Sequence, residues 1–407
     1  MQYVQRGNVR PWLRALAAGL VLATGCRNAL EVQNQQDILD TNLNSPNAII
    51  PLKNGVAGDY AVAFANAVDI VGLFGGELIH TGSFPSWEEV QSGIGTRPSS
   101  EGDNMYNQVE RAVWDADTVA VRIASFVKDP TTSADIAEVL VWGGFAHFML
   151  ADNFCQGTVH GSAAVSTDSL YRRAEGIFTQ ALTIASAANK SDLRLRALAG
   201  RARARLNLKN YSGALADASA IPVGWRFNAI YSANSSRENN TVATLTTTLI
   251  RREAGVNPRF YKDSSYIVDP RTPFLNRGDT AKGPDPTRQF VEQLKYPQRD
   301  TPIAVSSWQE ARLIAAEANA RLGNTTAVIP LINQVREAAT LPDYAGPTTQ
   351  GALLAAIEHE RSAELWLQAQ SLDDLRRFND PYLPATKRDN CFQIGLTEWN
   401  SNPNLGK

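Results

Sequence analysis

Two stretches of the chain repeat one spacing of aromatic and small residues, and this repeat limits the possible folds more than any other feature. The repeated residues are Tyr171, Ala174, Phe178 and Ala181 in the first stretch, and Tyr211, Ala214, Ala218 and Ile221 in the second. Intervals of three and four residues place side chains on one face of an α-helix. Small residues on that face let neighbouring helices pack closely, so the repeat predicts stacked helix hairpins.

Helical periodicity continues through most of the remaining chain. The expected helical regions are residues 47–73, 104–127, 133–154, 192–208, 308–322, 325–339 and 351–378. Ser133 or Asp135 is suited to cap the N-terminus of the third region. Because the repeat resembles the second helix of tetratricopeptide motifs, we predict a mostly α fold. In it, tetratricopeptide-like helix hairpins are stacked into one domain, residues 47–407.

Two long segments rich in Gly, Pro, Ser and Asn interrupt the helices, at about residues 72–103 and 222–307. Such segments commonly bind ligands, because loops display side chains that regular helix pairs bury. Within the second segment, residues 241–250 fit either a helix or a strand. We call these segments the first and second excursions.

Aromatic rings in the excursions are the candidate ligand contacts. They are Phe84, Trp87, Tyr261 and Tyr266. Trp87 is the first choice, because its ring is large and the carboxylates of Glu88 and Glu89 beside it can accept hydrogen bonds from sugar hydroxyls. The alternative for each ring is that it fills a gap between loop and scaffold.

A run of arginines occupies residues 194–205, and we interpret it as a solvated helix surface. The arginines are Arg194, Arg196, Arg201, Arg203 and Arg205. Apolar residues between them, such as Leu193, Ala197 and Leu206, supply the packed side of this helix. The formal net charge of the whole chain is -2. This balance argues against nucleic acid as a partner, because phosphates require an extended basic surface.

The first 26 residues have the order of an export signal. Basic residues precede a short apolar run, small residues follow, and Ala23-Thr24-Gly25-Cys26 resembles a lipobox. We predict a signal peptide at residues 1–25 and a lipid on Cys26. Polar residues 26–46 would then be a tether. The apolar run is roughly half of the ~20 residues needed to span a bilayer, and we expect no later apolar stretch of that length.

Two further cysteines remain, Cys155 and Cys391. In an exported protein they are candidates for a disulfide. The alternative is that each is separately buried as a free thiol.

The C-terminal helical region carries a family resemblance. The motif residues are Glu360, Arg361, Glu364, Asp374, Arg376 and Arg377. Their pattern resembles the ends of SusD/RagB proteins, and residues 316–318, 322–324 and 333–336 resemble the preceding helix pair of that family. One departure is that Gln368-Ala369 stands where the family has Glu-Gly. We expect structural roles: Arg361 and Glu364 can pair across one helical turn, and Asp374 and Arg376 can hold helix ends together.

The resemblance implies a nutrient-binding lipoprotein that is lipid-anchored in the bacterial outer membrane and faces the cell surface. Its partner would be a TonB-dependent transporter of the SusC type, and its ligand an oligosaccharide or a peptide. The alternative is a tetratricopeptide-like scaffold for outer-membrane assembly, which the helix hairpins fit equally well. We expect no enzyme, cofactor or metal site. His359-Glu360 begins a zincin-like motif, but Ala363 replaces the second ligand.

Overall fold

The computed structural model describes residues 43–94, 97–386 and 388–406. The chain divides into a first unit that ends at Ala48 and a second unit that starts at Ile49. The described part of the first unit contains a 3-10 turn, η2 (Pro46–Ala48). The expected signal peptide and Cys26 lie outside the described residues.

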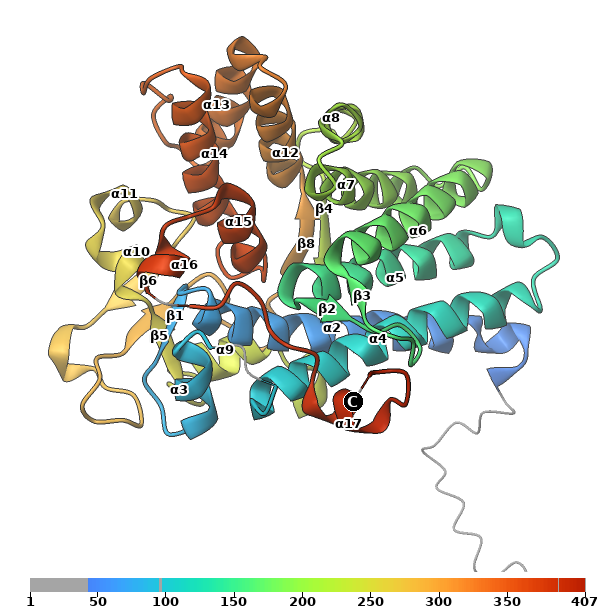
Figure 1. The fold of residues 1–407 in the computed structure, drawn as a ribbon, viewed down its shortest axis with the longest axis horizontal. Coiled ribbons are helices and arrows are strands. Elements are labelled where there is room, and N and C mark those ends of the chain that lie inside the picture. The colour runs from blue at the N-terminus through green and yellow to red at the C-terminus, as the bar shows by residue number, and fades with distance from the viewer. Residues whose placement is uncertain (1–42, 95–96, 387, 407) are drawn as a thin grey trace, which may run out of the picture. The chain divides into compact units, whose positions relative to one another are not determined.

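Six long helices form the N-terminal half of the second unit. They are α2 (Ile49–Phe74), α4 (Ser100–Ala124), α5 (Ala134–Asn153), α6 (Thr167–Ala187), α7 (Ser191–Asn207) and α8 (Tyr211–Ser219). Each packs against the next in this order, and Figure 1 shows them as successive layers. The hydroxyl of Ser133 caps α5 by accepting a hydrogen bond from the backbone N–H of Ile136. The predicted helix hairpins are therefore confirmed.

The repeated residues explain this packing. Seven of the eight are buried in α6, in α8 and just after α8, while Tyr211 is half-buried. Phe178 of α6 lies against Gly144 of α5 and Gly200 of α7, where an added Cβ would stand 2.6 Å and 2.2 Å from its ring. Small residues on the flanking helices thus make room for one large ring, as the spacing predicted.

The C-terminal helices continue the stack. They are α12 (Trp308–Arg321), α13 (Val328–Ala338), α14 (Gln350–Glu364) and α15 (Ser371–Phe378), with the 3-10 turn η6 (Thr325–Ala327) before α13. Helix α12 packs on α8, and a separate core cluster joins α12, α13 and α14 through Ala316, Ile332 and Leu353 among others. The region predicted as 351–378 is broken between α14 and α15, where Leu367 and Ala369 adopt left-handed backbone conformations.

Short elements organise the two excursions. The first excursion contains β1 (Leu78–His80) and α3 (Pro85–Gln91). The second contains β4 (Arg226–Ala229), η4 (Ser236–Glu238), α9 (Thr241–Thr246), β5 (Ala254–Val256), α10 (Pro258–Lys262), α11 (Ser264–Ile267), β6 (Phe274–Asn276), η5 (Gly278–Thr280), β7 (Val291–Gln293) and β8 (Ile303–Ser307). The undecided stretch from residue 241 thus begins with a helix.

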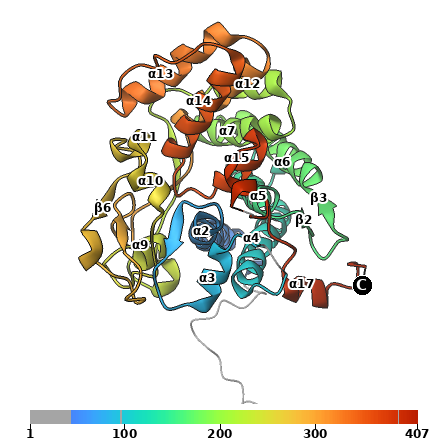
Figure 2. The same cartoon turned by 60° about the vertical axis from the view of Figure 1, so that its left-hand side comes forward.

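Strand pairing closes the second excursion and joins it to the first. Strands β4 and β8 pair antiparallel where the excursion leaves and rejoins the stack. Strand β1 pairs with β5 in the register Leu78 to Val256, and β6 pairs with β7. In Figures 1 and 2 this region lies beside the helix stack, with α3 and α11 well separated from each other.

The remaining elements are small. Strands β2 (Gln156–Gly157) and β3 (Val165–Ser166) form a hairpin between α5 and α6, and η3 (Pro130–Thr132) precedes α5. The tail after α15 contains two short helices, α16 (Tyr382–Ala385) and α17 (Leu396–Ser401).

Two described helices are long and apolar enough to cross a membrane, which corrects the expectation that none would be. They are the helix that ends at Phe74 and α5. Within the fold, 78% and 83% of their most apolar windows are buried. Burial of this extent is typical of core helices in a globular protein, so length and composition alone do not indicate a membrane span here.

The arginine run on α7 is not the solvated surface that the sequence predicted. Only Arg194 is exposed. Arg203 is buried, and its guanidinium donates to both carboxylate oxygens of Glu310 at 2.7 and 2.9 Å. Arg201 and Arg205 both pair with Asp217 at 2.8 Å. These arginines therefore connect α7 to α8 and α12.

Candidate functional site

A polar cavity of about 610 Å³ lies between the second excursion and the C-terminal helices. We call it the polar pocket. The side chains that carry its chemistry are Arg226, Lys295, Gln309, Thr340, Glu364 and Gln368. They come from the start of β4, the segment after β7, the first turn of α12, the residues after α13, and the end of α14 with the turn that follows it. A cavity of this volume is in the usual range for small-ligand sites.

Several polar groups of the polar pocket lack protein partners. The Oε1 atom of Gln309 is buried and accepts no hydrogen bond among the described residues. The closest cation to the Glu364 carboxylate is the Arg271 Nη1 atom at 3.9 Å, although the Glu364 side chain is only 11% exposed. Arg226 is exposed and forms no ion pair with any described residue. Unpaired buried polar atoms cost free energy unless water or a ligand satisfies them.

Lys295 fixes one wall of this pocket. Its Nζ atom donates to the backbone oxygens of Trp366 at 2.6 Å and of Glu364 at 3.1 Å. Burial lowers the pKa of Lys295 to about 8, although the carboxylates of Glu364 and Glu77 oppose that shift. Burial also raises the pKa of Glu364, against the effects of Lys295, Arg271 and Arg226. The pocket thus holds donors and acceptors that can exchange hydrogen bonds with a neutral polar ligand.

The first-choice ligand residue, Trp87, is buried, and its prediction as an exposed contact is wrong. Its side chain is 4% exposed. Trp87 belongs to α3, which starts with Pro85 in its first turn and buries Trp87 and Val90 on one face. Seven residues are too few to reveal this helix by periodicity. Nor is Glu88 free for sugar hydroxyls, since its carboxylate pairs with the guanidinium of Arg288 at 2.5 and 2.9 Å.

Tyr266 is also buried, at 5% exposure. Its hydroxyl donates to the Ser362 Oγ atom at 3.0 Å, and its ring packs on those of Phe260 and His359. This ring therefore fills a gap between α11 and α14. Tyr266 was predicted as a ligand contact, and its burial contradicts that prediction.

Phe84 and Tyr261 are half-buried. The Arg251 guanidinium lies over the Phe84 ring at 4.2 Å, and the Tyr261 ring lies 6.0 Å from that of Phe274. Neither residue lines the polar pocket. Their roles as ligand contacts stay predictions.

The family-motif residues build an ion-pair network between helices. Arg361 of α14 reaches Asp374 of α15 at 2.9–3.0 Å, and Arg377 contacts Glu317 of α12. Glu360 accepts from Arg271 at 2.7 Å and from Arg336 at 2.5 Å. The expected pair of Arg361 with Glu364 does not form, because Asp374 lies against Arg361 and Glu364 faces the polar pocket.

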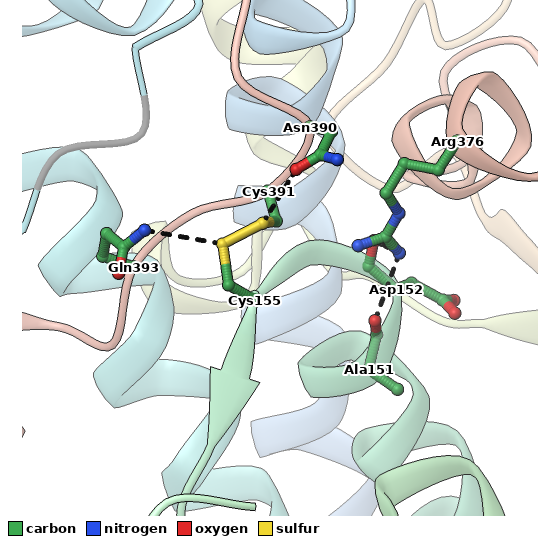
Figure 3. Close-up of a disulfide and its surroundings, with 7 residues drawn as sticks. All are labelled: Ala151, Asp152, Cys155, Arg376, Asn390, Cys391 and Gln393. Atoms are coloured by element: carbon green, nitrogen blue, oxygen red, sulfur yellow. Dashed lines mark hydrogen bonds between the residues drawn. A yellow bond between two sulfur atoms is a disulfide. The ribbon is translucent and has the colours of Figure 1, made fainter. Parts of the chain in front are cut away.

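The Arg376 side chain holds a helix end, as expected. Its Nη2 atom donates to the backbone oxygens of Ala151 at 3.2 Å and Asp152 at 2.7 Å, at the C-terminal end of α5 (Figure 3). These carbonyls have no partners within the helix, so the guanidinium satisfies them. The motif thus ties α15 to the centre of the stack.

The structure contains the predicted disulfide between Cys155 and Cys391, with 5.1 Å between their Cα atoms. Cys155 follows α5, and Cys391 lies in the C-terminal tail (Figure 3). Backbone bonds of 2.8 Å join Cys155 to Phe392 and Phe392 to Asn153, so the tail is also hydrogen-bonded to this end of α5.

Sequence reasoning missed a second, mostly apolar cavity. A groove of about 940 Å³ runs between α4, α5 and α6, and we call it the apolar groove. Its aliphatic lining residues include Val121, Ile136, Leu140, Ile177 and Ile184. Trp114 lies three residues before Asp117 and four residues before Thr118, which both line the groove. Its side chain is 53% exposed, and no other Phe, Trp or Tyr in the described part of the chain is exposed. The helical spacing places these residues on one face of α4.

Among the described residues, no group of three or more His, Cys, Asp or Glu side chains is placed to hold a metal ion.

Comparisons with known proteins identify the class from this architecture. Residues 310–403 match the model of the SusD family. A SusD superfamily protein of Bacteroides vulgatus has the same fold with a TM-score of 0.64 at 17% identity, over 87% of this chain and 97% of its own. One from Bacteroides thetaiotaomicron gives 0.66 at 14% identity, over 89% and 98%. No curated protein matches.

The class is thus that of helix-hairpin proteins with the SusD fold. The C-terminal residues 310–403 of the chain match the SusD family, and its fold is similar to that of SusD superfamily proteins. A third solved structure, from Bacteroides vulgatus, is a SusD-like carbohydrate binding protein with a TM-score of 0.63 at 16% identity, over 81% of this chain and 83% of its own.

Proposed function

We propose that the protein binds a carbohydrate nutrient in the polar pocket and delivers it to a TonB-dependent transporter of the SusC type. The observation that carries the proposal is the set of incompletely partnered polar groups in one cavity, above all Gln309 Oε1, which has no described partner, and the Glu364 carboxylate, whose one ion pair is 3.9 Å long. A SusD-like carbohydrate binding protein among the structural neighbours supports the ligand class.

The chemistry of the two cavities favours the polar pocket over the apolar groove. A sugar carries about one hydroxyl per carbon, and each hydroxyl left without a partner on binding costs on the order of 1–3 kcal/mol. Aliphatic residues make up much of the apolar groove, and its charged groups pair with one another, since Asp117 contacts His160 at 2.8 Å and Arg173 at 3.0 Å. The polar pocket instead offers the amide oxygen of Gln309, which has no described partner, and the exposed guanidinium of Arg226. The apolar groove and Trp114 suit a protein surface instead.

Calorimetric titration with a panel of oligosaccharides tests the ligand site. For a sugar that binds, Gln309→Leu should weaken binding by about tenfold, because one hydrogen bond of about 1–1.5 kcal/mol is lost. Gln180→Leu makes the same change in the apolar groove and should leave the affinity unchanged. The opposite result would move the site to the groove, and binding of peptides with no sugar would overturn the ligand class.

The proposal includes the lipid anchor on Cys26. Cys26→Ala should release the protein from membranes, because the thioether would no longer form. Membrane fractionation with intact mass measurement checks this. A Cys26→Ala protein that still sediments with the outer membrane, together with an unlipidated wild type, contradicts the anchor.

Co-purification separates a nutrient receptor from an assembly scaffold. A receptor should bring down one transporter barrel, whereas a scaffold should bring down insertion machinery. Trp114→Ala should weaken the first complex, since exposed aromatic residues commonly carry much of the energy at protein interfaces. Recovery of insertion machinery without a transporter would favour the scaffold.

A further inference from the structure

A third cavity, of about 540 Å³, lies where helix ends meet the C-terminal tail. We call it the basic pocket. Its charged lining residues are Lys209, Arg321, Arg376, Arg377 and Asp373. The disulfide forms part of the wall, and Figure 3 shows Cys391, Asn390 and Arg376 around it. The pocket is separate in its lining residues from both the polar pocket and the apolar groove.

Most of the arginine charge here has a structural partner. Arg376 contacts the Asp373 carboxylate at 3.4 Å, in addition to the two carbonyls of α5. Arg377 contacts Asp373 at 2.6 Å and Asp374 at 2.5 Å as well as Glu317. Arg321 lies 3.3 Å from the same Glu317. The three arginines are thus paired with three carboxylates, those of Glu317, Asp373 and Asp374. No carboxylate of this set is left to balance the charge of a further cation in the pocket.

That further cation is Lys209. Its side chain is exposed and makes no ion pair or hydrogen bond with a described residue, while its backbone N–H donates to the Leu206 oxygen at 3.0 Å. Lys209 also has a left-handed backbone, with φ of 61° in the turn between α7 and α8. The matching turns after α6 and α15 have Asn189 and Asn379 at φ of 55° and 54°. Asparagine tolerates this conformation better than lysine, so the turn itself does not require a lysine.

Two buried donors point to what the pocket receives. The Nδ2 atom of Asn207 and the Nε atom of Arg321 are buried and donate to no described acceptor. The opposite ends of both side chains are engaged, since Asn207 Oδ1 accepts from Arg377 and Arg321 Nη2 donates to the Arg377 carbonyl. The free N–H groups are thereby held in place. Such groups need an oxygen acceptor, and an anionic oxygen makes the strongest bond.

We propose that the basic pocket is a second binding site, for an organic acid whose carboxylate or phosphate accepts from Lys209, Arg321 and Asn207. The cavity volume exceeds what an inorganic anion fills, so the remaining space would hold the body of the ligand, such as an acidic monosaccharide. The site does not depend on what the polar pocket binds.

Calorimetry with the wild-type protein tests the site. The probes are glucuronate, glucose 6-phosphate and inorganic phosphate, with glucose as the neutral control. Glucuronate or glucose 6-phosphate should bind, whereas glucose should not bind at this site. A preference between the two acids distinguishes a carboxylate site from a phosphate site. If neither acid binds, the proposal is overturned.

Lys209→Asn is the decisive variant, because it removes the charge and installs the residue found in the two matching turns. It should weaken binding of the acid at least tenfold. Lys190→Gln removes an exposed lysine from the preceding turn and should leave the affinity unchanged. The melting temperature of Lys209→Asn should equal or exceed that of the wild type, so a loss of binding is not a loss of folding. Equal affinity of Lys209→Asn and wild type overturns the proposal.

Discussion

Two neighbouring regions place charged groups inside the protein: the ion-pair network of α14 and α15, and the polar pocket. The charged groups are paired in the network and incompletely paired in the pocket. In the network, arginines such as Arg361 and Arg377 lie against carboxylates of other helices. In the polar pocket, Glu364 has only a 3.9 Å contact with Arg271, and the Gln309 Oε1 atom has no described partner. Helix α14 contributes Arg361 to the network and Glu364 to the pocket. The difference indicates that paired residues hold the fold, while unpaired residues are available to a ligand.

The pKa values of Asp373 in the network and Glu364 in the polar pocket shift in opposite directions. Burial works to raise the pKa of Asp373, but Arg377 and Arg376 outweigh it and hold that pKa below its usual range. Burial raises the pKa of Glu364, and its more distant cations do not compensate. Ionised Asp373 therefore stabilises the fold, whereas ionised Glu364 costs free energy until something binds it.

Loss of the disulfide should have the largest effect, because it fixes the tail beside the network. The two cysteines lie 236 residues apart. Closing so long a loop stabilises by roughly 4–5 kcal/mol in the chain-entropy model, less any strain. Denaturant unfolding of a Cys155→Ser, Cys391→Ser double variant measures this. A loss below about 1 kcal/mol would show that the tail is held by its hydrogen bonds instead.

Breaking the network itself should cost nearly as much. Arg361→Met removes one of the two guanidinium groups that contact the Asp374 carboxylate and leaves Arg377 as the other. Removing one member of a buried ion pair commonly costs about 3–5 kcal/mol, and the remaining Arg377 places the expected loss at the lower end. Arg226→Met makes the same change at the polar pocket, where no pair is lost, and should change stability by less than about 0.5 kcal/mol. Equal losses in the two variants would erase the contrast between the regions.

The pH dependence of two neutralising variants should differ in sign. The folded-state pKa of Asp373 is depressed, so its stabilisation is present at neutral pH and is lost as the pH falls through that pKa. Asp373→Asn should therefore lower the melting temperature at pH 7, with a smaller difference near pH 3. The folded-state pKa of Glu364 is raised, so stability is lost as the pH rises through it.

Glu364→Gln should accordingly raise the melting temperature at pH 8, and the difference should shrink toward pH 4. Thermal unfolding followed by circular dichroism from pH 3 to 9 checks both variants. If both shift stability in the same direction at pH 7, the distinction between paired and unpaired carboxylates does not hold.

The smallest effect concerns the turn that separates the two regions. Ala369 has φ of 56°, a left-handed conformation that an alanine adopts with strain. The family pattern has glycine at this position, and the structure supplies the physical reason. Ala369→Gly should raise stability by about 0.5–1 kcal/mol, net of the greater freedom of glycine in the unfolded chain. A lower melting temperature would contradict this account.

Much of the helical scaffold could be predicted from the sequence, because its signals are local. Intervals of three and four residues marked α6 and α8, and Ser133 marked the start of α5. The disulfide was also within reach, since only two cysteines follow Cys26. The burial of Arg203 could not be predicted from the sequence, because its partner Glu310 lies 107 residues away along the chain.

Most of the candidate site could not be predicted from the sequence either, because its residues are distant from one another along the chain. The polar pocket takes Arg226, Lys295, Gln309 and Glu364 from four separate segments. The second excursion supplies Arg226 and Lys295 to this cavity, but aromatic content was a misleading guide within it. Tyr266 packs between elements, and in the first excursion Trp87 does the same. Composition cannot distinguish a ring that fills a gap from a ring that meets a ligand.

The spacing of the disulfide cysteines has a consequence for how the chain matures. A chain exported from its N-terminus would present Cys155 to an oxidising compartment long before Cys391 follows. Three free thiols would allow three pairings, and two of them would trap the chain in a wrong bond. A thioether on Cys26 removes that thiol from exchange and leaves one possible pairing. Lipidation would then protect oxidative folding as well as anchor the protein.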